Sequence, residues 1–311
     1  MLAGVSPFSS RPARVPLLLL LWALLAAPWA AAAEGARSLE QPSSDPPRRD
    51  PLAPLTQACQ AAQAAGDGAA LRQVQQQLLQ RPSQPEALGL LLARAEVLLG
   101  CKAPAGALEV LDRGRPGPGS ERQLWLLLRW QAAQAGLDHR LAADSLWRLA
   151  AGDLASLEPL ALPVSPTAQR SALDVLADHV EALGWHQRAA EVLLSGRHAG
   201  AQGAARLGRA VTLAQALPLA ERRQLLERAL EQAAQAGAWG LVAQLLDQQL
   251  ALEEGTAPDA LAVQRRLRLS PRIDDVYGEW RLRPRPELEQ HLRSPRQPGG
   301  HAATSPSSAQ P

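Results

Sequence analysis

The residues of this 311-residue chain best suited to chemistry are six histidines, two cysteines and a few acidic pairs. His179 and His186 are seven residues apart, but Gly184 between them predicts a turn, so they do not share one helix face as two metal ligands would. The acidic pairs at 253–254 and 274–275 have no histidine nearby and are interpreted as solvated charge. No zinc-protease, nucleophile-elbow or phosphate-loop motif occurs. We therefore expect no metal site, no catalytic residue and no cofactor, and we predict that the chain is not an enzyme.

The two cysteines, Cys59 and Cys101, could form a disulfide in an oxidising compartment or remain as small core residues. Cys59 lies seven residues before a glycine that should end one helix, and Cys101 directly follows another such glycine. If the two helices were aligned at these ends, the cysteines would be roughly 12 Å apart at ~1.5 Å rise per residue. A disulfide tolerates a Cα separation of only ~7 Å. We therefore expect unpaired thiols.

Tryptophan is the aromatic residue that this chain uses most. Trp147 is predicted to lie on an apolar helix face, and Trp185 and Trp239 directly follow expected turns. We interpret these three as bulk that fills gaps between layers of alanine and leucine. Trp130 is one position off the apolar stripe of its helix, so we expect it to face a groove and to be a candidate contact for a partner.

An Arg-rich segment, residues 269–293, departs from the helical pattern. Residues 265–296 carry nine Arg against five acidic residues, and Tyr277 and Trp280 stand together in "VYGEW". We predict an extended stretch from Ser270. One interpretation is an end cap, in which Ile273 and its aromatic neighbours cover the last layer of a repeat array. The other is an element recognised by a partner, with arginines that attract an acidic surface or anionic lipid.

The elements that must position these residues are helices. Between residues 52 and 268 strong helix formers dominate, and no run alternates apolar and polar residues with period two. Segments with apolar residues at i, i+3, i+4 and i+7 occur in pairs on either side of a glycine that fits a helix C-terminus. These pairs predict ten or eleven helices arranged as antiparallel hairpins, with no strand. The glycines of the expected turns are Gly66, Gly100, Gly136, Gly184 and Gly237.

The first turns are 34 and 36 residues apart, and periods near 34 with helix–turn–helix content are typical of an α-solenoid. In "LLLARAEVLLGCKAPAGALEVLDRGRP" large and small residues alternate as in a tetratricopeptide repeat: Leu91, Ala95, Leu98, Ala107 and Leu111, with Trp125 34 residues after Leu91. The chain therefore resembles the tetratricopeptide-repeat family over 52–150 and more loosely over 166–252. Tyr and Phe are missing from the aromatic positions. The resemblance implies an all-α fold of stacked hairpins and a binding function.

The N-terminus has the features of an export signal. Arg11 and Arg14 precede an apolar run that ends in "AAA" before Glu34, the order of a cleavable signal peptide over residues 1–33. The alternative is an uncleaved segment that tethers the protein to the membrane. Removal of residues 1–33 takes two of the 32 basic residues and none of the 30 acidic ones, so the mature chain is formally neutral. That balance does not favour nucleic-acid binding.

We divide the rest into a disordered linker at 34–51, helical hairpins at 52–150, a Pro-containing connection at 151–165, hairpins at 166–268, the Arg-rich segment and a disordered tail at 294–311. Ser165 and Pro166 are predicted to begin the helix after the connection. The hypothesis for function is a non-catalytic exported scaffold, periplasmic or extracellular, that binds a protein or peptide partner through a concave face. The alternative is a helical accessory subunit of a cell-envelope enzyme complex whose active site lies on another chain.

Overall fold

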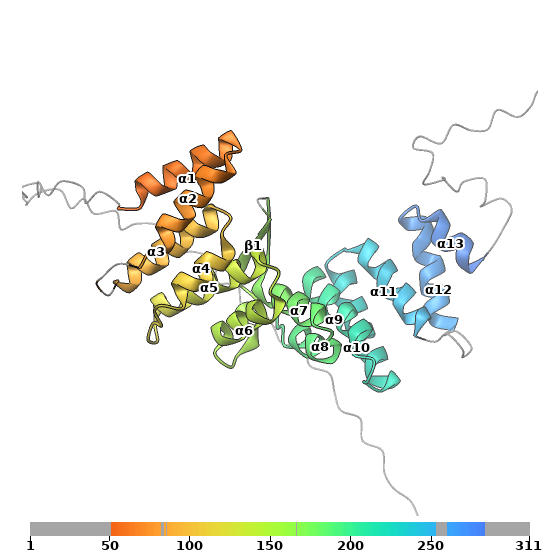
Figure 1. The fold of residues 1–311 in the computed structure, drawn as a ribbon. Coiled ribbons are helices and arrows are strands. Elements are labelled where there is room, and N and C mark those ends of the chain that lie inside the picture. The colour runs from red at the N-terminus through yellow and green to blue at the C-terminus, as the bar shows by residue number, and fades with distance from the viewer. Residues whose placement is uncertain (1–50, 82–83, 85, 166, 253–259, 284–311) are drawn as a thin grey trace, which may run out of the picture. The chain divides into compact units, whose positions relative to one another are not determined.

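The computed structural model describes residues 51–81, 84, 86–165, 167–252 and 260–283, and it is built mainly of helices (Figure 1). Within these residues, thirteen α-helices are present, which is more than the ten or eleven expected. Their bounds are α1 Ala53–Ala65, α2 Gly68–Leu79, α3 Leu88–Gly100, α4 Pro104–Leu111, α5 Ser120–Ala135, α6 His139–Ala150, α7 Ala172–Ala182, α8 His186–Leu194, α9 Ala201–Leu213, α10 Leu219–Gln235, α11 Trp239–Ala251, α12 Ala260–Leu269 and α13 Val276–Leu282.

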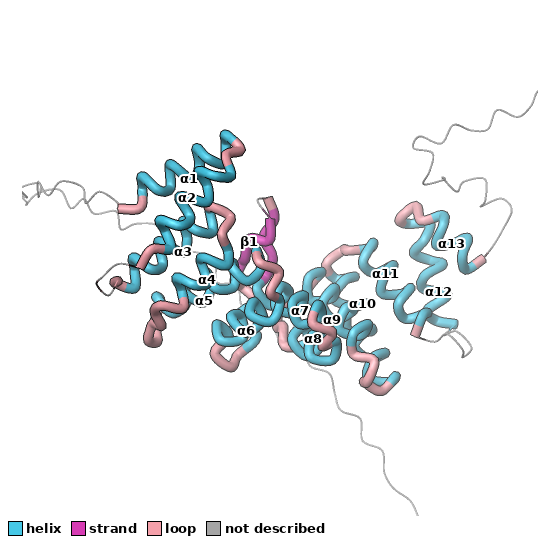
Figure 2. Tube along the Cα trace, in the orientation of Figure 1, coloured by secondary structure: helices cyan, strands magenta, loops and turns pink. Residues whose placement is uncertain are grey.

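Each helix packs against its neighbours in sequence, from the pair α1 and α2 to the pair α12 and α13. Helices two positions apart also touch, as α3 does with α5 and α9 with α11. The tube view shows short loops between the helices (Figure 2). Because nearly all packing is between near neighbours in sequence, the described chain is an all-α stack of hairpins of the α-solenoid kind. The predicted fold class is confirmed.

At three of the five predicted turns, the glycine adopts the left-handed conformation that was expected at the end of a helix. Gly66, Gly184 and Gly237 have φ values of 67°, 76° and 67°, the left-handed conformation in which a Cβ is strained. At the other two turns the left-handed residue is not the glycine. Lys102, two positions after Gly100, has a φ value of 56°, and Leu137, one position after Gly136, has a φ value of 59°.

The connection at 151–165 contains structure that the sequence analysis did not expect. A 3₁₀ turn at Leu154–Leu157 leads to two antiparallel strands, β1 Ala161–Ser165 and β2 Ala168–Ser171. The predicted start of the next helix at Ser165 is therefore wrong. Ser171 is the N-cap of α7, because its Oγ accepts a hydrogen bond from the backbone N–H of Leu173. Residues 168–171 pair with β1 instead of forming the first helical turn.

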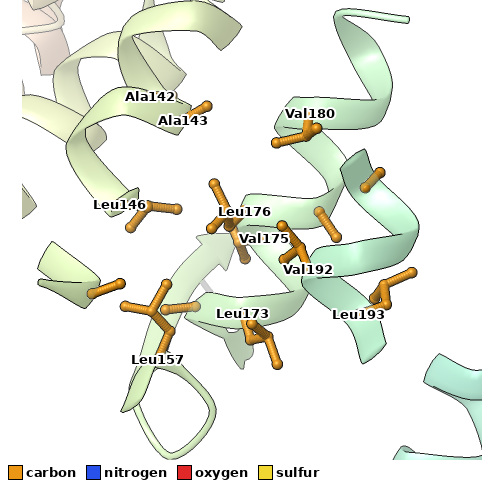
Figure 3. Packing of buried hydrophobic residues seen from close by; sticks show 14 of the residues in the cluster. Ala142, Ala143, Leu146, Leu157, Leu173, Val175, Leu176, Val180, Val192 and Leu193 are labelled. Atoms are coloured by element: carbon orange, nitrogen blue, oxygen red, sulfur yellow. The ribbon is translucent and has the colours of Figure 1, made fainter. Parts of the chain in front are cut away.

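Three clusters of buried apolar side chains follow one another along the chain. The central cluster joins α6, the 3₁₀ turn, α7 and α8, and Figure 3 shows Leu146, Leu157, Leu176 and Val192 directed toward one another. Many of its members are alanines, so these helices approach closely. The C-terminal cluster lies on α9, α10, α11 and α12, and it forms the base of the groove described below.

Cys59 and Cys101 are joined by a disulfide bond, so the expectation of unpaired thiols is wrong. Their Cα atoms are 5.7 Å apart. The estimate of 12 Å assumed that α1 and α3 end at the same level. Instead the chain just after α3 crosses the second half of α1, where Cys59 is bonded to Cys101 and Gln63 Nε2 donates a 2.7 Å hydrogen bond to the carbonyl of Gly100. The shift between the two helices brings the cysteines together.

The predicted signal peptide, residues 34–50 of the linker, residues 284–293 of the Arg-rich segment and the tail at 294–311 lie outside the described residues. In the part of the chain that is described, no helix is both long and apolar enough to cross a membrane.

Candidate partner-binding groove

A groove of about 600 Å³ runs between α10 and α12, with α11 beneath it. Helix α11 contacts both flanking helices, so its side chains form the floor while α10 and α12 form the walls. The lining residues are Gln224, Glu227, Arg228, Leu230, Glu231 and Ala234 of α10, Trp239, Val242 and Leu246 of α11, Arg265, Arg268 and Leu269 of α12, and Arg272 after it.

The spacing of the wall residues explains why they face the same way. On one wall lie positions 224, 227, 228, 231 and 234 of α10, and on the other lie positions 265 and 268 of α12 and position 272 just after it. Both sets follow the i, i+3, i+4, i+7 pattern of one helix face. Each helix therefore buries one stripe in the core and presents a second stripe to the groove.

The floor of the groove is apolar. Leu230, Val242, Leu246 and Leu269 are at least nine-tenths buried in the C-terminal cluster. Trp239, the first residue of α11, remains 48% exposed at the groove. A large aromatic side chain beside an apolar floor is the usual composition of an anchor for a ligand side chain.

A bridging ion pair joins the two walls. Arg265 Nη1 donates hydrogen bonds to both carboxylate oxygens of Glu227, at 2.9 and 3.0 Å. Gln249 of α11, which is buried, donates to the same carboxylate at 3.1 Å. Glu227 is therefore bonded from the opposite wall and from the floor, and these bonds link α10, α11 and α12.

A second arginine of α12, Arg266, links this helix to α11 and to the start of α13. Arg266 is 2% exposed and pairs with Asp247 of α11 at 3.0 Å, with Ser270 Oγ at 2.7 Å and with Asp275. Burial lowers the pKa of Arg266, but the bonds to Asp275 and Asp247 outweigh it and the net pKa lies above the ordinary value. Arg266 therefore stays charged and connects α11, α12 and the start of α13.

The sequence-based prediction for Trp130 is wrong. Its side chain is 2% exposed and belongs to the central core cluster, so it does not face a groove. Its Nε1–H donates a 3.2 Å hydrogen bond to Nε2 of His179, and Nδ1 of His179 lies 3.0 Å from Nδ1 of His139. A tryptophan one position off an apolar stripe can thus still be core when a buried polar partner receives its N–H.

These contacts determine the protonation of the histidine pair. Nε2 of His179 accepts from Trp130, so neutral His179 carries its proton on Nδ1 and donates it to His139. A second proton on His179 would be on Nε2, which would then point its N–H at the N–H of Trp130 and could no longer accept a hydrogen bond from it. Burial, with a smaller contribution from the charge of His139, lowers the pKa of His179 from 6.5 to about 4, against an opposing effect of Asp178. This cluster supports the packing of α5, α6 and α7.

Two of the other tryptophans, Trp185 and Trp239, are less buried than predicted. Trp185 is 38% exposed, and its ring stacks on that of Trp147 with centroids 6.4 Å apart. Arg188 lies over the ring of Trp147 at 4.6 Å. Trp147 does pack against the central cluster as expected, but Trp185 and Trp239 do not fill gaps between layers.

The segment after α12 is helical, although an extended stretch was predicted. A 3₁₀ turn at Ser270–Arg272 is followed by α13, and Ile273 packs against the C-terminal cluster. Tyr277 is 59% exposed, and its ring stacks with Trp280 at 6.0 Å between centroids. Ile273 thus covers the core as an end cap would, whereas Tyr277 is open to a partner.

A buried ionic cluster around Glu158 was missed by the sequence analysis. Arg206 pairs with Glu158 and, at 2.6 Å, with Asp174, and the backbone N–H groups of Arg197 and His198 also donate to Glu158. Burial raises the pKa of Glu158, but these bonds outweigh it, so the net pKa lies below the ordinary value. All its acceptor sites are used within the chain, so the cluster fixes the connection against α7 and α9 and offers no site for a ligand.

Arg265, Arg268 and Arg272, which line the groove, stood in the Arg-rich stretch that the sequence analysis noted, but the groove itself was not predicted. Comparison with family models, with curated proteins and with solved structures gave no match to this chain.

Proposed function

We propose that this protein is a non-catalytic helical-repeat scaffold that holds a protein or peptide partner in the groove between α10 and α12. The observation that carries the proposal is the combination of an apolar floor, an exposed Trp239 and walls linked by the pair Glu227–Arg265. A preformed groove lowers the entropy lost on binding, because its walls are already ordered. The tetratricopeptide-like resemblance supports the same function by analogy.

The buried polar groups of the described residues support a non-catalytic role. His179, Glu158 and Arg206 have unusual environments, but each is hydrogen-bonded to other side chains within the core. None of them lines the groove. The groove is lined by no histidine, cysteine or serine, and of its two glutamates Glu227 is already bonded to Arg265 and Gln249.

Export is part of this proposal. The disulfide between Cys59 and Cys101 is of a kind that persists in oxidising compartments, and it agrees with the signal-peptide pattern of residues 1–33. The mature protein would then meet its partner outside the cytosol, in the periplasm or beyond.

The test is a peptide-display selection against the full mature chain, followed by affinity measurements with two variants. We expect selected peptides to lose about tenfold or more in affinity for Trp239→Ala, because an anchor side chain contributes more than ~1.4 kcal/mol. Trp185→Ala is the matched control, since this tryptophan is also partly exposed and follows a helix turn on another hairpin. Equal affinities for both variants and the parent, or no selected peptide at all, would contradict the proposal.

A further inference from the structure

We infer that the partner of the groove is an acidic peptide segment: one or two large apolar side chains flanked by Asp or Glu. This inference rests on the proposed function and specifies the chemistry of the partner. It is supported by the charged residues of the walls and by their position around the apolar floor. It is also supported by the difference between arginines that form ion pairs within the chain and arginines that do not.

The walls carry an excess of positive charge. Four of the lining residues are arginines and two are glutamates, which gives a formal charge of +2. Glu227 and Arg265 neutralise each other across the groove. Three arginines, Arg228, Arg268 and Arg272, then stand against Glu231 alone. Their field favours a partner with negative charge.

These three arginines are available for a partner. All three side chains are exposed, and none forms an ion pair with another described residue. The arginines next to them behave differently, since Arg265 and Arg266 are both bonded to carboxylates. Free guanidinium groups bind carboxylates with two parallel hydrogen bonds, which gives both affinity and orientation.

A purely local role does not account for the set. Arg268 lies in the last turn of α12 and Arg272 in the 3₁₀ turn that follows, where positive side chains offset the negative end of the helix dipole. Arg228 is in the middle of α10 on the opposite wall, where the dipole has no such effect. Placement on both walls is expected if the arginines contact the two sides of a bound segment.

The surroundings of the arginines favour a peptide over a membrane surface. An anionic bilayer could reach the exposed guanidinium groups, but it would leave Val242 and Leu246 at the base of the groove unused. A peptide can place an apolar side chain on that base, beside Trp239, while its carboxylates meet the walls. The groove of about 600 Å³ has room for a few side chains of this kind.

The test compares three versions of a groove-binding peptide: acidic, with Asp and Glu changed to Asn and Gln, and with both changed to Lys. Fluorescence anisotropy with the full mature chain should give about tenfold weaker binding for the amide version and still weaker binding for the Lys version. The double variant Arg268→Glu with Arg272→Glu should reverse the order. Arg122→Glu with Arg140→Glu, two exposed arginines of α5 and α6, is the control of equal charge change and should preserve the order.

The outcomes separate this inference from the proposed function. If peptides bind and remain sensitive to Trp239→Ala but all three versions bind equally, the charge inference is overturned and the groove proposal stands. If no peptide is sensitive to Trp239→Ala, the proposed function itself fails. Vesicles of phosphatidylcholine with and without phosphatidylglycerol form the last arm. If Arg268→Glu with Arg272→Glu abolishes vesicle binding but leaves the order of the peptides unchanged, the arginines serve a membrane and the inference is wrong.

Discussion

The pair His179 and Trp130 gives a prediction about stability at low pH. The pKa of His179 is lowered to about 4 in the folded protein, while an unfolded histidine keeps a value near 6.5. Between these values the unfolded chain binds a proton that the folded chain does not. The stability that His179 contributes is therefore fully present above pH ~6.5 and is lost as pH falls toward 4.

The magnitude follows from the two pKa values. Each pKa unit corresponds to about 1.4 kcal/mol, so the loss is about 2 kcal/mol at pH 5 and approaches about 3 kcal/mol below pH 4. The perturbation is His179→Gln. Its amide can accept from Trp130 and donate to His139, and it does not titrate. When the pH is lowered, the difference in unfolding free energy between the parent and His179→Gln should shrink by these amounts, because only the parent loses the contribution of His179.

The assay is urea unfolding of the oxidised protein at several pH values between 4.5 and 7.5, followed by circular dichroism. Titrating groups that do not contact His179 are present in both proteins and cancel in the difference. His186→Gln is the control, because its side chain is exposed at the start of α8. Parallel pH dependences for the parent and His179→Gln would refute the assignment of a neutral histidine bonded to Trp130.

Three further predictions concern the disulfide, the arginine anchor and the end of the stack. Cys59 and Cys101 should not react with a thiol reagent when the protein is unfolded without reductant, and reduction should destabilise it by up to about 4 kcal/mol for a cross-link spanning 42 residues; reactive thiols would contradict the bond. Arg266→Met should cost about 2 kcal/mol or more, because Asp275 loses its arginine partner and Asp247 is left with Arg281, whereas Arg268→Met should change stability by less than about 0.5 kcal/mol. Equal effects in thermal unfolding would contradict the anchor. Tyr277→Ala should also change stability by about 0.5 kcal/mol or less, because this ring is 59% exposed, and a larger loss would mean that it is part of the cap.

The helical hairpins could be predicted from the sequence because their signals are local. Apolar residues with helical spacing identified the faces, and Gly66, Gly184 and Gly237 marked the left-handed turns. The start of α7 was misplaced because Ser165-Pro166 and Ser171 both match the local rule for a helix N-terminus. The pairing of residues 168–171 with β1 decided between them, and that pairing is a contact between segments.

The disulfide and the groove depend on how helices are placed against each other. Helical rise alone separated Cys59 from Cys101, while the shift between α1 and α3 brings them to 5.7 Å. The groove needs α10 and α12 on either side of α11. In the sequence, the groove corresponds to a polar stripe on each of the two flanking helices, one containing Glu227 and the other Arg265. Such a stripe also occurs on any helix face that is exposed to solvent, so it does not predict a groove. The burial of Trp130 could not be predicted locally, because its hydrogen-bond partner His179 is 49 residues away in the sequence.

Photo-crosslinking with a selected peptide tests the central claim, binding in the groove, most directly. The peptide carries a photoreactive phenylalanine in place of its apolar anchor, and the crosslinked residues are mapped by mass spectrometry on the full mature chain. We predict that the adducts fall on the residues that surround Trp239, within 224–246 and 265–272, and that unlabelled peptide competes for them. Adducts concentrated near Trp185, or spread over helices α1 to α8, would contradict the claim that the groove between α10 and α12 is the binding site.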